Sequence, residues 1–215
     1  MRTAIFDLDG TITRRDTLIA YIIGLLARRG PLAPLRLLRA IPAILAYALH
    51  RDRGRLKSAV IRATIGGSTR QELAVWTSQF VDRLLRTGVH DDAVNAIALH
   101  RRMGDVLALL SASPDLYVPE IGARLGFHEV ICTQLQWHAD RLDGALVSEN
   151  RRGAEKVRCV GEIRARYPGH PAVAYGNAAS DVAHLSIVDH GVLVNATGKL
   201  RCAAQRRGIE CVEWR

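Results

Sequence analysis

The chain has 215 residues, of which 48% are hydrophobic and 24% charged, so it is long enough for one well-buried core with a modest insertion. This composition excludes a disordered chain and a fibrous protein. The 30 Lys and Arg residues outnumber the 21 Asp and Glu residues, and the resulting net charge of +9 suits nucleic acid, an anionic membrane surface or a phosphorylated substrate as a partner.

The N-terminal half of the sequence predicts one short strand followed by helices. Residues 3–6 form an apolar run that ends in the turn Asp7-Leu8-Asp9-Gly10. From residue 17 to about 88, apolar residues recur at helical spacing, with breaks at Gly30-Pro31 and Gly66-Gly67. We predict one helix from residue 17 to the first break and a pair of apolar helices over about 32–49. A further helix is predicted over 69–85, with Ser68 or Thr69 as its N-cap.

After residue 88 the sequence alternates between helical and strand patterns. We predict helices over about 91–103, 116–125, 153–167, 179–186 and 198–207, and strands over 106–110, 130–133, 172–175 and 192–194. Residues 134–148 contain Asp143-Gly144, which favours a β-hairpin. The alternation predicts an α/β fold with a doubly wound parallel sheet. We place the α/β core at residues 1–13 and 89–215 and an inserted all-helical cap at residues 14–88.

The cysteines and the N-terminus favour a cytoplasmic protein. No Cys-x-x-Cys spacing occurs, so we expect reduced thiols at Cys132, Cys159, Cys202 and Cys211. The first six residues lead directly to Asp7, whereas a secretory signal needs a basic start and a sustained apolar run. The most apolar stretch, residues 32–49, is interrupted by Arg36, Arg39 and two prolines, so we expect it to lie on a membrane at most and not to cross one.

Polar residues gather in the turns that follow the predicted strands, where open parallel sheets bind their ligands. They are Asp7 and Asp9 with Gly10 and Thr11, then Ser111 with Ala112, then Lys156 before a helix, and then Asn177 and Asp181. Carboxylate and amide oxygens suit Mg²⁺, and a hydroxyl, backbone N–H groups and an ammonium group can hold phosphoryl oxygens. In such a site Asp7 can attack phosphorus, while Asp9 protonates the leaving oxygen and then activates water.

Four segments carry the site residues in a recognisable order. They are Phe6-Asp7-Leu8-Asp9-Gly10-Thr11, Leu109-Leu110-Ser111-Ala112-Ser113-Pro114, Gly153-Ala154-Glu155-Lys156-Val157 and Gly176-Asn177-Ala178-Ala179-Ser180-Asp181. Together they resemble the four motifs of the haloacid dehalogenase-like superfamily of phosphotransferases. The helical segment between the first two motifs resembles the cap of the subclass that contains phosphoserine phosphatase. The resemblance covers nearly the whole chain.

This resemblance implies a role for each matching residue. Asp7 would be the nucleophile and Asp9 the general acid and base. Mg²⁺ would be held by the Asp7 carboxylate, the Asp9 main-chain carbonyl and Asn177, with Asp181 close by. The phosphoryl group would be bound by Gly10, Thr11, Ser111, Ala112 and Lys156. Asp16 matches an acidic position at the entrance to the cap, where it can face substrate.

The fourth motif departs from the pattern of the superfamily at one position. That motif usually begins Gly-Asp, whereas this chain has Gly176-Asn177. An Asn oxygen can ligate Mg²⁺ but brings no negative charge, so we expect a lower affinity for the ion than at an Asp site. Asn177 is either an accepted variant or the mark of a weakened or inactive enzyme.

The positive charge of the chain is concentrated in the inserted segment. Residues 14–90 contain 14 Lys and Arg against four acidic residues, whereas the remainder has 16 basic and 17 acidic residues. Apolar helices flanked by basic residues, as at 32–49, are typical of binding to an anionic lipid surface. The arrangement is loosely similar to the cap of the bacterial phosphatidylglycerophosphate phosphatases of the same subclass. The alternative is that these apolar side chains pack against each other or against a second copy of the chain.

Three functions therefore stay open at this point. The first is a phosphatase that acts on a phospholipid or lysolipid phosphate at the inner face of the membrane. The second is a soluble phosphatase for a small metabolite such as phosphoserine, with Arg53, Arg55 or Arg62 as the partner of a substrate carboxylate near Asp16. The third is a basic binding module without activity. We do not expect nucleic acid as a partner, because aromatic residues make up only 5% of the chain and no recognised nucleic-acid motif is present.

Overall fold

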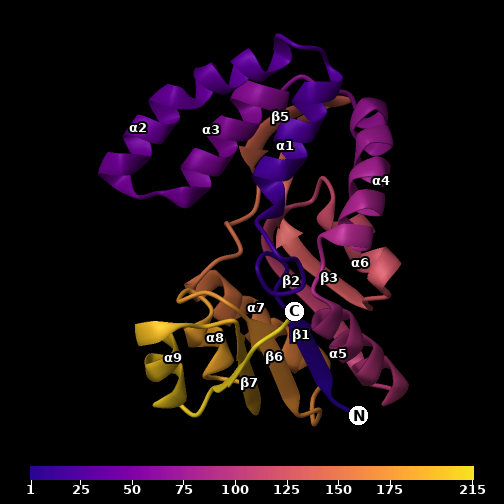
Figure 1. Cartoon of the computed structure of the whole chain (residues 1–215), viewed down its shortest axis with the longest axis vertical. Helices are drawn as coiled ribbons and strands as arrows, with labels where there is room; N and C mark the ends of the chain where they lie inside the picture. The colour runs from indigo at the N-terminus through magenta and orange to yellow at the C-terminus, as the bar shows by residue number, and fades with distance from the viewer.

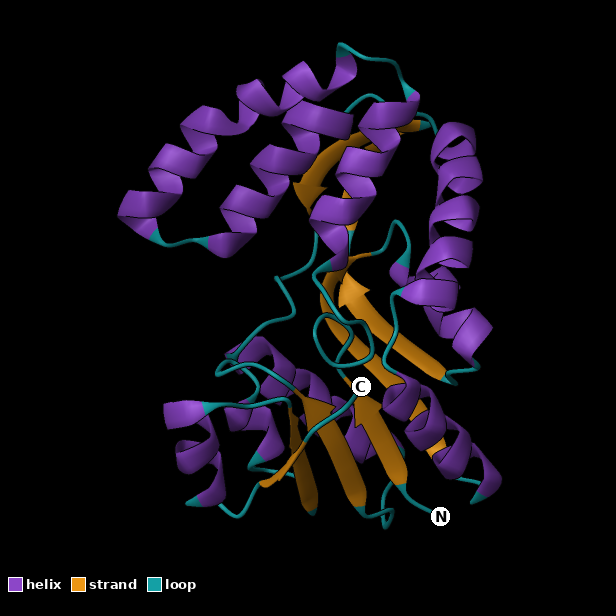
Figure 2. Ribbon diagram, viewed as in Figure 1, coloured by secondary structure: helices purple, strands orange, loops and turns teal.

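The computed structural model describes residues 1–215, apart from the side chain of His50. Its centre is a six-stranded parallel sheet in the order β3-β2-β1-β6-β7-β8 (Figures 1 and 2). The strands are β1 (Thr3–Phe6), β2 (Val106–Pro114), β3 (Glu129–Thr133), β6 (Ala172–Gly176), β7 (His190–Val194) and β8 (Glu210–Val212). This confirms the predicted parallel α/β fold. The three-residue strand β8 lies outside the predicted strands.

Helices cover both faces of the sheet because the buried strands are apolar on both sides. In β1, Ala4 and Phe6 contribute to one core cluster, which includes side chains from α5 (Asp91–Arg102) and α6 (Val118–Leu125). Ile5, between them, contributes to a second cluster with side chains from α7 (Ala154–Arg166), α8 (Val182–Leu185) and α9 (Gly198–Gln205). The alternation of side chains along the strand thus produces the doubly wound arrangement.

The inserted segment forms a helical layer over the edge of the sheet at which the strand arrows end (Figure 1). It contains α1 (Thr17–Arg28), η1 (Ala33–Ala40), α2 (Ile41–His50), α3 (Arg53–Ile65) and α4 (Arg70–Thr87). Thr69 caps α4, since its side chain accepts a hydrogen bond from the Glu72 N–H at 3.2 Å. The first half of the predicted apolar pair is a 3₁₀ helix rather than an α-helix, with Pro34 in its first turn.

A β-hairpin that comes later in the sequence packs against the helical layer. Its strands are β4 (Leu135–His138) and β5 (Arg141–Leu146), which confirms the hairpin expected near Asp143-Gly144. Gly144 lies against the backbone of α3, where a Cβ atom would crowd Arg62. Thr69 and Arg141 form an isolated bridge. The hairpin therefore fixes the position of α3 over the sheet edge. Among the residues that the structure describes, no helix is long and apolar enough to cross a membrane.

Candidate active site

The predicted site residues converge between the carboxyl ends of the strands and the helical layer. A pocket of about 440 Å³ is lined by side chains from both parts of the molecule. The predicted residues in its lining are Asp7, Asp9, Gly10, Asp16, Ala112, Lys156, Asn177 and Asp181. The parallel pairing of β1 with β2 and with β6 explains this convergence, because it aligns the turns that follow these strands.

Lys156 joins two of the carboxylates in the floor of the pocket. Its Nζ lies 2.8 Å from Asp7 Oδ1 and 2.8 Å from Asp181 Oδ1, and all three side chains are buried. Burial raises the pKa of Asp7 to about 6, although Lys156 opposes this effect. Burial opposes the charged form of Lys156 as well, but the two carboxylates outweigh it and raise the pKa of the ammonium. Lys156 is therefore a fixed positive charge beside Asp7.

Asp9 is held by hydroxyl and amide donors rather than by a cation. Its Oδ1 accepts hydrogen bonds from the Thr17 N–H at 2.7 Å and the Thr17 hydroxyl at 2.6 Å, and its Oδ2 accepts one from the Ser113 hydroxyl at 2.6 Å. Tyr117 OH lies 3.0 Å from the Thr17 hydroxyl. Burial raises the pKa of Asp9, although the Ser113 and Thr17 hydrogen bonds oppose this change. Asp7 and Asp9 thus have different environments. Two carboxyl groups in different environments can take different protonation states, as distinct acid–base roles require.

Asp181 and Gly10 together fix the loop that carries Asn177. Asp181 Oδ2 accepts hydrogen bonds from the N–H groups of Asn177, at 3.2 Å, and Ala178, at 2.9 Å. Gly10 has a φ of +78°, and a Cβ atom there would overlap the side-chain amide of Asn177. The amide of Asn177 therefore lies directly against the turn that follows β1, which requires glycine at position 10.

The donors in this pocket fit Mg²⁺ in chemical type. The Asp7 carboxylate, the Asn177 amide oxygen and main-chain carbonyls are hard oxygen ligands, and Asn177 packs against the same turn that contains Asp7 and Asp9. Within the described residues, no three His, Cys, Asp or Glu side chains are gathered in a metal-binding cluster. A site here thus depends on one carboxylate together with amide and carbonyl oxygens and the waters that Mg²⁺ retains.

Ser111 and Thr11 are buried beneath the pocket lining. Ser111 Oγ accepts a hydrogen bond from the Ser113 N–H at 3.0 Å, so it supports the turn that carries Ser113. The Thr11 hydroxyl lies 3.4 Å from Asp7 Oδ2. Asp16 lines the pocket and also caps α1, since it accepts a hydrogen bond from the Leu18 N–H at 3.0 Å.

The structure adds residues that the sequence did not assign to the site. Lys57 of α3 reaches into the pocket, where its Nζ donates to the Ala112 carbonyl and, at 2.6 Å, to Asn150 Oδ1. Burial lowers the pKa of Lys57 to about 8, although Asp9 and Asp16 oppose the change. Residues 14–88 contain 13 arginines and one lysine, Lys57, and this difference in residue type could have marked Lys57 as a site residue. Ser113 lies two positions after Ser111 in the same motif, so the sequence could also have indicated it as a site residue.

Comparison with known proteins identifies the family. The haloacid dehalogenase-like hydrolases match residues 4–186 of this chain. The chain belongs to the haloacid dehalogenase-like hydrolase family. The resemblance expected from the four motifs is therefore confirmed, and with it the assignment of the chain as an enzyme of the phosphatase type in this family.

Two curated relatives cover most of the chain. Protein CicA of Caulobacter vibrioides is 34% identical over 189 residues, which are 86% of this chain and 82% of the relative. Phosphoserine phosphatase SerB1 of Mycobacterium tuberculosis is 27% identical over 221 residues, covering 99% of this chain and 70% of the relative.

Solved structures share the fold over nearly the whole chain. A protein of unknown function from Bordetella pertussis Tohama I superimposes with a TM-score of 0.80 at 23% identity, covering 98% of this chain and 97% of that one. A phospho-aspartyl intermediate analogue of phosphoserine phosphatase superimposes with a TM-score of 0.68 at 15% identity, covering 98% of this chain and 92% of that one. These likenesses confirm the fold.

Proposed function

We propose that this chain is a Mg²⁺-dependent phosphomonoesterase that transfers the phosphoryl group of its substrate first to Asp7 and then to water. The observation that carries the proposal is the contrast between two carboxyl groups in one pocket. Asp7 lies 2.8 Å from a buried ammonium, which favours its anionic form, whereas burial raises the pKa of Asp9 and favours its protonated form, despite the hydroxyl and amide donors around it. A nucleophile and a proton donor need these two environments.

The transfer to Asp7 uses the oxygen that Lys156 leaves available. Lys156 contacts Asp7 Oδ1, so Oδ2 attacks phosphorus, and the new O–P bond forms as the P–O bond to the leaving alcohol breaks. The carboxyl group of Asp9 donates its proton to the leaving oxygen, and the product alcohol departs. The ammonium groups of Lys156 and Lys57, both in the pocket lining, stabilise the negative charge on the phosphoryl oxygens.

Hydrolysis of the aspartyl-phosphate reverses the role of Asp9. Its carboxylate now accepts a proton from water, and the water oxygen attacks phosphorus while the bond to Asp7 Oδ2 breaks. Thr17 and Ser113 keep the Asp9 carboxyl group oriented through both steps. The Asp7 carboxylate, the Asp9 carbonyl and Asn177 would hold Mg²⁺, which supplies positive charge to the phosphoryl oxygens and to the Asp7 anion when bound.

Release of inorganic phosphate from small phosphomonoesters, with and without Mg²⁺, tests this proposal. Asp7→Asn and Asp9→Asn should each lower kcat by at least about a thousandfold. Asp82→Asn is a matched control, because Asp82 is exposed on α4 and pairs with Arg124, and neither residue lines the pocket. Undiminished turnover in Asp7→Asn, or full activity in a metal chelator, would contradict the mechanism. The relatives named phosphoserine phosphatase support a phosphorylated small molecule as the substrate.

A second candidate places the substrate at an anionic membrane surface. The observation that favours it is a row of exposed aliphatic side chains that begins just before η1 and continues along η1 and α2. They are Leu32, Leu35, Leu38, Ile41, Ile44, Leu45 and Leu49, and they are 45–81% exposed. Arg36, Arg39 and Arg51 are exposed on the same segment. Basic side chains near an anionic surface contribute about 1 kcal/mol each, and the aliphatic row adds apolar area that lipid would cover.

Cosedimentation with vesicles separates the two candidates. The second candidate predicts salt-sensitive binding to phosphatidylcholine vesicles that contain phosphatidylglycerol, no binding to phosphatidylcholine alone, and loss of binding in Leu45→Asp. Val75→Asp is the matched control, since Val75 is exposed on α4 instead. If a second copy of the chain covers the row, Leu45→Asp will change the sedimenting mass without affecting lipid binding, and the membrane candidate is then wrong.

A further inference from the structure

An arginine-rich groove opens beside the catalytic pocket. It encloses about 890 Å³ between the start of α3 and residues 145–153, the segment that ends β5 and leads to α7. Four residues line both the groove and the pocket around Asp7, namely Arg53, Asn150, Arg152 and Ser180. The groove is therefore continuous with the place where the phosphoester is expected to react, and a substrate bound at Asp7 can extend into it.

The groove carries more positive charge than its own acidic residues neutralise. Its lining contains Arg51, Arg53, Arg55, Arg62 and Arg152, together with the acidic Asp52 and Glu149. Arg55 is paired with Asp52 at 3.2 Å, and Arg62 is paired with Asp143 at 2.6 Å. Within the part of the chain that the structure describes, the other three arginines have no carboxylate within ion-pair distance. Even with Glu149 counted against them, the groove keeps a net positive charge.

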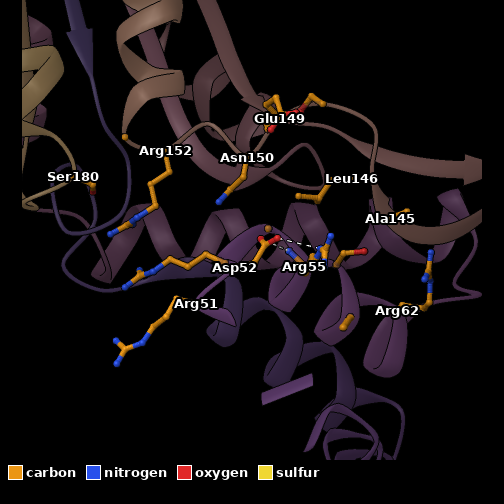
Figure 3. A pocket seen from close by; sticks show the side chains of 16 residues that line it. Arg51, Asp52, Arg55, Arg62, Ala145, Leu146, Glu149, Asn150, Arg152 and Ser180 are labelled. Atoms are coloured by element: carbon orange, nitrogen blue, oxygen red, sulfur yellow. Dashed lines mark hydrogen bonds and ion pairs between the residues drawn. The ribbon is translucent and has the colours of Figure 1, made fainter. Parts of the chain in front are cut away.

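The unpaired arginines gather at the end that joins the catalytic pocket. Figure 3 shows Arg51 and Arg152 extending toward the side of the groove where Ser180 lies, whereas Arg62 stands at the opposite end. Arg53 and Arg152 also line the catalytic pocket itself. These guanidinium groups are thus placed to meet a part of the substrate that lies beyond the reacting phosphoryl group.

We propose that this end of the groove binds a second phosphate, so that the preferred substrate carries one phosphate ester at Asp7 and another phosphate on its leaving group. Three unpaired guanidinium groups exceed what one carboxylate can satisfy with two oxygens and a single charge. A phosphate offers three acceptor oxygens and nearly two charges, and it can accept paired N–H bonds from more than one arginine. This inference rests on the proposed phosphatase activity and specifies the class of its leaving group.

The test compares three esters of the same short chain. Propyl phosphate has no second anion, its analogue with a terminal carboxylate has one charge, and propanediol bisphosphate has a second phosphate. We expect kcat/KM to be highest for the bisphosphate. Arg53→Gln and Arg152→Gln should each lower the ratio of kcat/KM for the bisphosphate to that for propyl phosphate by about tenfold, the effect of one charge-assisted hydrogen bond. Arg86→Gln, which removes an exposed arginine of α4, should leave the ratio unchanged.

The outcomes distinguish a failure of the second-phosphate site from a failure of the phosphatase activity. If wild-type protein hydrolyses none of the three esters, the proposed phosphatase function fails. If it hydrolyses them with equal kcat/KM, or if the two groove variants keep the wild-type ratio, the second-phosphate site is wrong. A preference for the carboxylate ester also overturns it. Vesicles with phosphatidylinositol bisphosphate, whose head group has two phosphomonoesters, then show whether a lipid or a soluble bisphosphate supplies the second phosphate.

Discussion

Replacing Lys156 with Met removes the ammonium group that lies between two buried carboxylates. Asp7 Oδ1 and Asp181 Oδ1 each lie 2.8 Å from Lys156 Nζ, so the two oxygens are at most twice that distance apart. Without the lysine, two negative charges at this separation repel by roughly 3 kcal/mol at an effective dielectric constant of about 20. Breaking a buried ion pair in this way typically lowers the free energy of unfolding by about 3 to 5 kcal/mol.

A double-mutant cycle separates this repulsion from other effects of the substitution. Asp181→Asn removes one of the two carboxylates, so the repulsion left by Lys156→Met disappears in the double variant. We therefore expect the double variant to be more stable than the sum of the single losses predicts, by about 1 to 3 kcal/mol. The sign of this coupling follows directly from the shared contact with Lys156.

Urea unfolding in the presence of a metal chelator measures these free energies. Lys199→Met is the matched control, because Lys199 is exposed and its loss should change stability by less than about 0.5 kcal/mol. A Lys156→Met variant within 1 kcal/mol of the wild type, or a double variant without coupling, would show that Lys156 does not hold the two carboxylates against their repulsion. The phosphatase mechanism adds that Lys156→Met loses at least about a hundredfold in kcat, even where the variant is folded.

Three further predictions concern single residues. Asn177→Asp should bind Mg²⁺ at least about tenfold more tightly, measured by titrating activity, and an unchanged Mg²⁺ requirement would show that this position is not a ligand. Because burial lowers the pKa of Lys57 to about 8, kcat/KM should fall as pH rises through 8 and the ammonium is lost, and Lys57→Arg should remove this alkaline limb. The pKa of Asp105 is lowered, since the His100 hydrogen bond at 2.8 Å and the Arg2 N–H outweigh the effect of burial. The stabilisation from the ionised Asp105 is thus present above pH ~4 and lost below it, so Asp105→Asn should lower the free energy of unfolding at neutral pH and less so in acid, and a pH-independent difference would argue against this origin.

The catalytic pocket was largely predictable because parallel strands align their carboxyl ends. Asp7 and Asn177 directly follow buried strands and Asp9 lies in the same turn as Asp7, so the sheet brings them together. The sequence also predicted the hairpin from Asp143-Gly144 and a cap for α4 at Ser68 or Thr69, of which Thr69 is the cap in the structure, since both features depend on local backbone chemistry.

The contacts between the helical layer and the core were not predictable in the same way. The hydrogen bond from Lys57 to Asn150 joins residues 93 positions apart, and no local pattern specifies it. β2 continues beyond the predicted end at residue 110 to Pro114, with a register shift against β3, and this extension presents Ser113 to Asp9. The arginine groove likewise depends on how α3 and the segment after β5 face each other, which is a long-range property.

Trapping of the phosphorylated enzyme shows whether Asp7 carries the phosphoryl group during turnover. Protein mixed with a phosphomonoester substrate and Mg²⁺ is quenched in acid, and the peptides are analysed by mass spectrometry. We predict one phosphoryl group on the peptide that contains Asp7 and its absence in Asp7→Asn. With p-nitrophenyl phosphate, whose leaving group departs without a proton from Asp9, we predict its accumulation in Asp9→Asn, where the water that attacks phosphorus lacks its base. Phosphorylation at another residue, or substrate turnover without any labelled peptide, would contradict the account.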